Sequence, residues 1–159
     1  MEACIDIFLK GSIAGYKDIL VEEFYQMAGK EYEYDPPRYA LFPGVYFELA
    51  CPPKHIINRA SSFIDLDDFT AIHLECGLID RWELSVNKGL DEEIFDVKSK
   101  LISLLDESKE WVFFFELNCD QIDSIYFLSS LGLMEKIESN LDWESEPEGF
   151  VAVCATKRR

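Results

Sequence analysis

The run Trp111-Val112-Phe113-Phe114-Phe115-Glu116-Leu117 limits the fold of this chain more than any other feature. All of its residues except Glu116 are apolar, so it lacks the polar alternation of a half-exposed strand. Successive side chains of a strand point to opposite faces of a sheet, and an apolar run of this kind predicts a strand covered on both faces. The chain must therefore build a sheet and supply cover for each side of it.

Shorter segments predict the other strands. Residues 4–9, 44–51 and 150–155 are rich in apolar and β-branched side chains. Residues 69–76 and 81–86 alternate apolar with polar positions, and the short segment 77–80 between them predicts a hairpin.

Apolar residues at helical spacing predict four helices, with capping residues at several ends. They are expected at residues 13–28, 53–62, 91–107 and 120–131. Residues 30–43 are expected to form a loop, because adjacent Pro36 and Pro37 disfavour a helix or a central strand. The segment 133–137 fits either type of element.

These elements predict an α+β fold, with a mixed β-sheet of about five to six strands and three to four helices packed on it. Helices and strands alternate along most of the chain, which accommodates both parallel and antiparallel pairing. The length of 159 residues and the absence of a linker-like segment predict that residues 1–159 form a single globular domain.

The charge is far from balanced. The chain has 31 acidic and 15 basic residues, a formal net charge of −16. Such a charge repels nucleic acid and anionic membranes and favours basic partners, although it also serves solubility alone. Between Asp91 and Glu148, sixteen acidic residues stand against four lysines, so most of the net charge lies in the C-terminal half.

The five cysteines are expected to be free thiols, because they are far apart and lie mostly in apolar runs. No CxxC or CxxH spacing occurs, which argues against a zinc site or a redox pair. The N-terminus lacks the pattern of a signal peptide, and no apolar stretch approaches the length of a membrane span. These observations together predict a cytoplasmic protein.

No known catalytic motif is present. The eight glycines are scattered, so neither a dinucleotide fingerprint nor a P-loop can be assembled, and no Gly-x-Ser-x-Gly sequence occurs. These absences weigh against nucleotide-dependent enzymes and serine hydrolases. We therefore predict no catalytic residue, no metal and no cofactor.

His73 is the residue that could contradict this prediction. It is expected to share a strand face with Glu75, next to Arg81 and Glu83 on the following strand. A histidine flanked by carboxylates can transfer protons or bind a metal, but a solvated face of charged pairs fits the same pattern. Cys119, at an expected helix start, is a weaker candidate for a nucleophile.

Partner binding is the remaining prediction, at three acidic or aromatic segments. A tryptophan amid carboxylates has the composition of an interface hot spot, and the alternative is that it folds onto the core. Aspartates clustered before a strand could hold a hard cation or could stabilise a turn. The predicted residues are Asp142, Trp143, Glu144, Glu146 and Glu148, with Tyr32 and Tyr34, and Asp65, Asp67 and Asp68.

In size, charge and fold class the chain resembles the bacterial immunity proteins that neutralise nuclease toxins, although no motif carries the resemblance. A nuclease needs a basic cleft to hold phosphate, and an acidic protein can block such a cleft. The resemblance implies a non-catalytic inhibitor of a basic toxin. A regulatory or adaptor domain for another basic protein, or an enzyme that uses the His73 face, are the alternatives.

Overall fold

The computed structural model describes residues 3–42, 45–49, 52–74, 76–89, 91–118 and 121–155. The side chains of residues 41, 42, 45–48 and 76 are outside this description. Within the described ranges, no helix is both long and apolar enough to cross a membrane.

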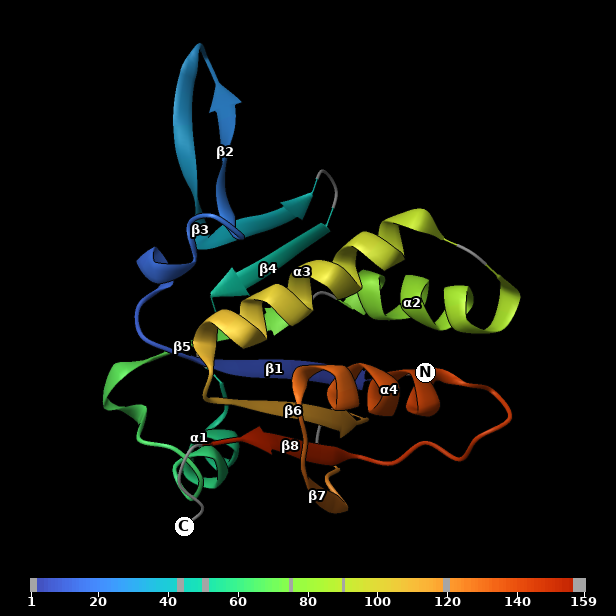
Figure 1. Cartoon of the computed structure of the whole chain (residues 1–159). Helices are drawn as coiled ribbons and strands as arrows, with labels where there is room; N and C mark the ends of the chain where they lie inside the picture. The colour runs from blue at the N-terminus through green and yellow to red at the C-terminus, as the bar shows by residue number, and fades with distance from the viewer. Residues whose placement is uncertain are drawn as a thin grey trace.

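A single eight-stranded sheet forms the centre of the fold, in the order β2-β3-β4-β5-β1-β6-β8-β7 (Figure 1). Its strands are β1 (Ala3–Lys10), β2 (Val21–Met27), β3 (Lys30–Phe42), β4 (Val45–Leu49), β5 (Phe69–Leu74), β6 (Trp111–Leu117), β7 (Ser124–Phe127) and β8 (Phe150–Cys154). Neighbouring strands are antiparallel except β7 and β8, which are parallel. The prediction of an α+β fold with a mixed sheet is confirmed.

Helices cover the two faces of the sheet unequally. The helices are α1 (Lys54–Ala60), α2 (Cys76–Lys88), α3 (Glu92–Ser108) and α4 (Ser130–Leu141), with short 3-10 turns η1 (Ile13–Tyr16) and η2 (Leu66–Asp68). The larger apolar core joins α2, α3 and α4 to one face, and a smaller core joins α1 to the other. We call these the three-helix face and the α1 face.

Strand β6 contributes to both cores, as its sequence predicts. Trp111, Phe113 and Phe115 lie in the core of the three-helix face, whereas Val112 and Phe114 lie in the core of the α1 face. All five side chains are at most 1% exposed. Burying a large apolar side chain contributes about 1.5–3 kcal/mol, so this strand stabilises both layers at once.

Several predicted elements are confirmed. Strands were expected at 4–9, 44–51, 69–76, 111–117 and 150–155, and the structure has β1, β4, β5, β6 and β8 there. The short helix after Pro53 is α1. The helix expected from residue 91 is α3, which Asp91 caps by accepting a hydrogen bond from the Glu93 backbone N–H at 3.0 Å.

The predicted helix at residues 13–28 is wrong. Only η1 is helical there, and residues 21–27 form β2, which pairs with β3 in a hairpin. Phe24 and Met27, taken as part of an apolar helical stripe, are 47% and 56% exposed. Gly29 belongs to a two-residue hairpin turn with Ala28, both at positive φ, and does not end a helix.

The predicted loop at residues 30–43 is also wrong, because residues 30–42 form β3. The prolines are tolerated because the pairing with β2 is interrupted where they occur. Glu23 faces Arg38 and Phe24 faces Glu33, so residues 34–37 have no partner on β2. Proline lacks a backbone N–H and fits such a bulge.

The predicted strand at 81–86, and with it the hairpin to residues 69–76, is wrong. The segment belongs to α2, whose Leu78, Ile79 and Trp82 are buried in the core of the three-helix face. Six residues of alternating polarity are too few to separate a strand from a helix.

The predicted helix at 120–131 is replaced by β7 and the first turn of α4. Ser129 caps α4 by accepting a hydrogen bond from the Gly132 backbone N–H at 3.1 Å, so Gly132 lies within the helix and not past its end. Cys119 and Asp120 lie outside the described residues.

The expectation that every cysteine is a free thiol is wrong for Cys4, which is disulfide-bonded. Cys154 is a free thiol, and its partial burial raises the pKa of the thiol. Disulfides are rare in reducing compartments, so the cysteines do not support the predicted cytoplasmic location.

Gly149 gives a direct test of the packing before β8. A Cβ atom at this position would lie 1.8 Å from the Gln121 carbonyl oxygen, so an alanine must displace backbone. We expect Gly149→Ala to lower the free energy of unfolding by about 2 kcal/mol or more, measured by urea denaturation. The control is Gly77→Ala in α2, where nothing lies within 4 Å. That change should be neutral or stabilising by about 0.5–1 kcal/mol. Equal effects of the two substitutions would contradict the prediction.

Candidate functional site

The predicted partner-binding residues fall at three separate places. Tyr32 and Tyr34 lie on the β2–β3 hairpin, which projects from the layers at the top of Figure 1. The three aspartates lie at η2, in the green segment at the left, and the loop after α4 runs at the lower right. The structure therefore does not join them into one surface, and each place has to be judged by itself.

The loop of residues 142–148, which we call the Trp143 loop, is fixed at its beginning by Asn87 of α2. The Asn87 side chain donates to the Leu141 carbonyl at 2.7 Å and accepts from the Trp143 backbone N–H at 2.9 Å. Asp142 then closes a turn, because its carboxylate accepts from the Glu144 backbone N–H at 2.9 Å.

A second asparagine fixes the end of the Trp143 loop. Asn140, which is 2% exposed, donates to the Glu148 carbonyl at 2.7 Å and accepts from the Glu148 N–H at 3.0 Å. The Glu148 carboxylate accepts hydrogen bonds from the Ser124 hydroxyl, the Tyr126 hydroxyl and the Lys136 ammonium. Glu148 was predicted to bind a partner protein. In the structure its carboxylate is instead hydrogen-bonded to side chains of the same chain.

The remaining side chains of the Trp143 loop point to solvent. Trp143 is 52% exposed, with the Lys88 ammonium 5.3 Å from its ring centroid on one side. Glu144 and Glu146 are exposed, and no cation among the described residues pairs with either carboxylate. The alternative that Trp143 packs into the core is therefore excluded for this structure.

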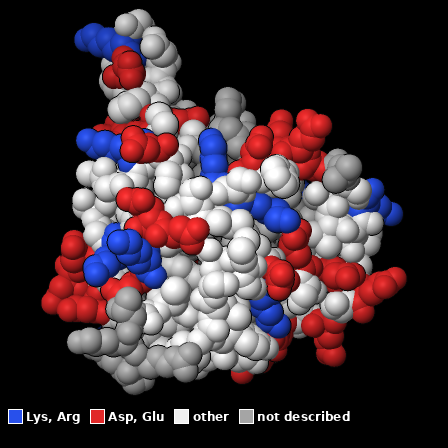
Figure 2. All heavy atoms as spheres, in the orientation of Figure 1, with Lys and Arg blue, Asp and Glu red and all other residues white. Residues whose placement is uncertain are grey.

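Many other carboxylates of the C-terminal half are paired inside the protein. Glu138 accepts from Lys98 at 2.7 Å and from the Trp82 indole N–H at 3.2 Å. Figure 2 shows carboxylates gathered over the start of α3 and along the Trp143 loop, at the right of the view. Several carboxylates are therefore neutralised locally, and others, such as Asp96 and Glu107, are exposed like Glu144 and Glu146. What distinguishes Glu144 and Glu146 is their position beside the exposed Trp143.

The aspartates at η2 form a turn. Asp65 caps η2 by accepting from the Asp67 backbone N–H at 3.0 Å, as aspartates in turns commonly do. No group of three or more potential metal ligands occurs among the described residues.

The hairpin tyrosines contact each other, with Tyr25 stacked on Tyr32 and tilted against Tyr34. The Tyr25 ring lies 5.6 Å from that of Tyr32 and 5.1 Å from that of Tyr34, and the Arg38 guanidinium lies 4.4 Å from the Tyr34 centroid. Tyr32 is 37% exposed. These contacts gather three aromatic rings on one side of the hairpin.

His73 has a different neighbour from the one predicted. Its Nδ1 lies 3.1 Å from Oδ1 of Asp6, which is directly opposite on β1 and 4% exposed. The expectation that Arg81 and Glu83 face His73 is wrong, because both belong to α2 on the other face of the sheet. Glu75 lies outside the described residues.

His55, the other histidine, makes a similar pair. Its Nε2 lies 3.3 Å from Oε2 of Glu116, which is 1% exposed. In the β1–β6 pairing Asp6 faces Phe114, so Asp6 and Glu116 are diagonal neighbours on the α1 face, roughly 7–8 Å apart. Sequence reasoning missed both carboxylates, although each is the lone charge in an otherwise apolar strand segment.

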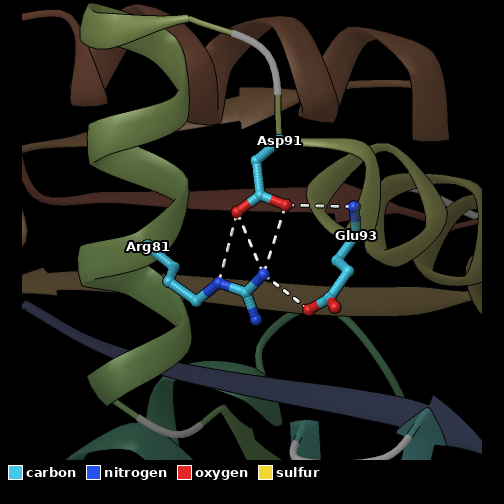
Figure 3. Close-up of polar contacts among 3 residues, drawn as sticks. All are labelled: Arg81, Asp91 and Glu93. Atoms are coloured by element: carbon cyan, nitrogen blue, oxygen red, sulfur yellow. Dashed lines mark hydrogen bonds and ion pairs between the residues drawn. The ribbon is translucent and has the colours of Figure 1, made fainter.

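Arg81 has a structural role (Figure 3). Its guanidinium donates to both carboxylate oxygens of Asp91, at 3.0–3.2 Å, and to Glu93 at 2.6 Å. Although desolvation acts to raise the pKa of Asp91, the hydrogen bonds and charge of Arg81 hold that pKa below its ordinary value. The pair joins α2 to the first turn of α3.

Glu148 predicts a pH dependence. Hydrogen bonds from Lys136 and Tyr126 lower the pKa of Glu148 below its ordinary value of 4.5. A lowered pKa in the folded state adds stability that is present above the unfolded pKa and is lost as pH falls through the folded one. We expect Glu148→Gln to lose about 1–2 kcal/mol of unfolding free energy at pH 7, and the loss to shrink below about pH 4. Denaturation at several pH values tests this, with exposed Glu146→Gln as the control. A loss that does not change with pH would contradict it.

The His73–Asp6 pair predicts a double-mutant effect. Removing His73 leaves Asp6 buried without this partner, so His73→Ala should cost about 3 kcal/mol of unfolding free energy. Asp6→Asn in the His73→Ala background removes the buried charge and should restore part of that loss. Urea denaturation of the single and double variants measures it. If the double variant is no more stable than His73→Ala, the loss of stability in His73→Ala does not come from leaving the Asp6 carboxylate without this partner, and the prediction is wrong.

Comparisons with known proteins do not extend these observations. No protein-family model, no curated protein and no solved structure matches the chain. The choice between functions therefore rests on the geometry, in which an exposed tryptophan on an ordered acidic loop is the feature best suited to binding.

Proposed function

We propose that this chain is a non-catalytic binding protein that engages a basic protein partner through the Trp143 loop. The observation that carries the proposal is the exposed Trp143, 52% accessible on a loop whose two ends are hydrogen-bonded by Asn87 and Asn140. We assign no catalytic residue and no cofactor to this function.

The order of the loop supports binding, because a surface that is already fixed loses little conformational entropy when it meets a partner. Tryptophan is enriched among the residues that dominate binding energy, and its large ring can be desolvated in one step. Trp143 therefore serves as the central apolar anchor. Its position over Lys88 leaves the rest of the ring accessible.

The charge around the anchor favours a basic partner. Glu144 and Glu146 are exposed and unpaired among the described residues, within a chain of net charge −16. Long-range attraction of this kind speeds the encounter with a positively charged surface and disfavours acidic partners. A basic cleft that holds phosphate, as in a nuclease, has the complementary charge.

An immunity protein that inhibits a nuclease toxin is the specific form of the proposal. The charge, the size and the α+β fold support it. The Trp143 loop, which lies between α4 and β8 and outside the sheet, supports it as well. The runner-up is a regulatory or adaptor domain that binds another basic protein through the same loop, and the identity of the partner distinguishes the two.

Affinity capture from the source organism, followed by calorimetry with the purified partner, tests the surface. We expect Trp143→Ala to raise Kd by about 30-fold or more, as for a hot-spot residue. Glu144→Lys with Glu146→Lys should slow association by about tenfold and weaken its salt dependence. For the immunity form, co-expression with the captured toxin should protect cells with the wild-type chain and not with Trp143→Ala.

Matched controls lie away from the loop. Leu131→Ala removes an apolar side chain that is 64% exposed at the start of α4, and Asp96→Lys reverses an exposed charge on α3. Both should leave Kd unchanged. The proposal is wrong if the captured protein is not basic, or if the Trp143 and Glu144/Glu146 variants bind it as the wild type does.

A further inference from the structure

Strand β2 is an open edge of the sheet. It is the terminal strand of the eight, and Val21, Phe24, Tyr25 and Met27 are between 36% and 63% exposed. Proteins usually protect such an edge with charged side chains, a proline, a β-bulge or a short length. In the seven residues of β2, both charges (Glu22 and Glu23) and the interrupted pairing with β3 lie before Phe24. The segment from Phe24 to Met27 has no charge and no proline. The opposite edge, β7, has only four residues.

Among the described residues, no further strand lies beside the outer half of the β2–β3 hairpin. Strand β4 pairs with β3 only between Arg38 and Phe42, so residues 24–33 form a two-stranded ribbon that projects from the body (Figure 1). Two strands alone are marginally stable in water. An additional strand would stabilise this ribbon.

The backbone of β2 is arranged to accept that strand. A two-residue turn at Ala28 and Gly29, with φ of 52° and 77°, makes Met27 and Lys30 the closing hydrogen-bonded pair. The N–H and C=O groups of alternate residues in an antiparallel strand point to opposite sides, so those of Tyr25 and Met27 point toward β3. The N–H and C=O groups of Glu22, Phe24 and Gln26 then point away from β3, toward the open edge.

The side chains of β2 are complementary to a second, antiparallel copy of β2. A two-fold axis at Phe24 places Phe24 opposite Phe24 of the second copy, Val21 opposite Met27, Glu22 opposite Gln26 and Glu23 opposite Tyr25. The outward backbone groups of Glu22, Phe24 and Gln26 then face each other across the axis. This register uses the whole strand and sets no like charges directly opposite.

The second copy also brings a hydrogen-bond donor, the Gln26 amide, to a place where the carboxylates of Glu22 and Glu33 repel each other. Desolvation and the neighbouring charge of Glu33 raise the pKa of Glu22, so two carboxylates crowd the face that carries Phe24. In the two-fold register the Gln26 amide of the other copy lies opposite Glu22 and can donate a hydrogen bond to it.

We propose that the chain forms a two-fold dimer in which the β2 strands of two copies pair antiparallel about Phe24, giving one continuous sheet. The interface is isologous, so it closes with two copies. It uses the hairpin and leaves the Trp143 loop at the other end of each molecule accessible. It is independent of the proposed function.

Charge sets the conditions for this dimer. Each copy has a net charge of −16, so association at low ionic strength is opposed by repulsion between the whole molecules. Salt screens that repulsion more than it affects the backbone hydrogen bonds and apolar contacts of the interface. The dimer should therefore tighten when NaCl is raised from about 0.05 to 0.5 M.

Sedimentation equilibrium of the full chain tests the dimer. We expect a monomer of 18.4 kDa in equilibrium with a species of twice that mass. Phe24→Glu places like charges on the axis and should raise the dimer Kd by about tenfold or more. Phe95→Glu is the control, because Phe95 is 69% exposed on α3, away from the hairpin. Circular dichroism confirms that both variants fold.

Cysteine cross-linking tests the register. Phe24→Cys should form a disulfide across the axis under mild oxidation, identified by mass spectrometry of the linked peptide. Met27→Cys should not, because the two Met27 positions would be roughly 20 Å apart along the paired strands. A chain that stays monomeric in high salt, a dimer that resists Phe24→Glu, or equal cross-linking at both positions would overturn the proposal.

Discussion

The two-sided burial of β6 is the constraint on which the rest of the structure depends. Phe113 and Phe115 on one side, and Phe114 on the other, each need a covering layer, because a large ring left in water loses a stabilisation of about 1.5–3 kcal/mol. Three helices supply one layer, and the short α1 supplies the other. Two carboxylates, Asp6 and Glu116, are buried on the α1 face. Each is compensated by a histidine, and the chain has only two histidines.

Internal pairing decides how much of the acidic charge can act on a partner. The net charge of −16 suggests a uniformly acidic surface, but Asp91, Glu138 and Glu148 are held by arginine or lysine inside the protein. Those pairs fix helices and loop ends, and their cations reduce the field nearby. The exposed Glu144 and Glu146 lie on a loop whose backbone is held at its two ends by Asn87 and Asn140, and whose last residue, Glu148, is paired with Lys136. Neutral amide side chains thus order most of the segment that presents the binding charges.

The two edges of the sheet differ in a way that the position of the hairpin explains. Strand β7 is short and continues directly into the cap of α4, so little backbone remains open beside it. Strand β2 instead belongs to a hairpin whose outer half extends beyond β4, so Phe24 and Tyr25 are exposed to solvent. An edge of this length persists in a protein either when its charge keeps copies apart or when another strand covers it. The self-complementary register about Phe24 favours the second explanation.

The sequence by itself determined the α+β class, the two-sided strand β6, the helix capped by Asp91 and the presence of an acidic tryptophan segment. In these places local pattern and tertiary packing agree. Tertiary structure decided the segments where a short pattern fits two elements equally: residues 21–27 became a strand because β3 pairs with them, and residues 81–86 became a helix because Trp82 packs into the core. It also decided the partners of His73, since Asp6 is 67 residues away in the chain and only strand pairing brings it opposite. Pairing between distant segments is set by the free energy of the whole fold, which no local window of residues contains.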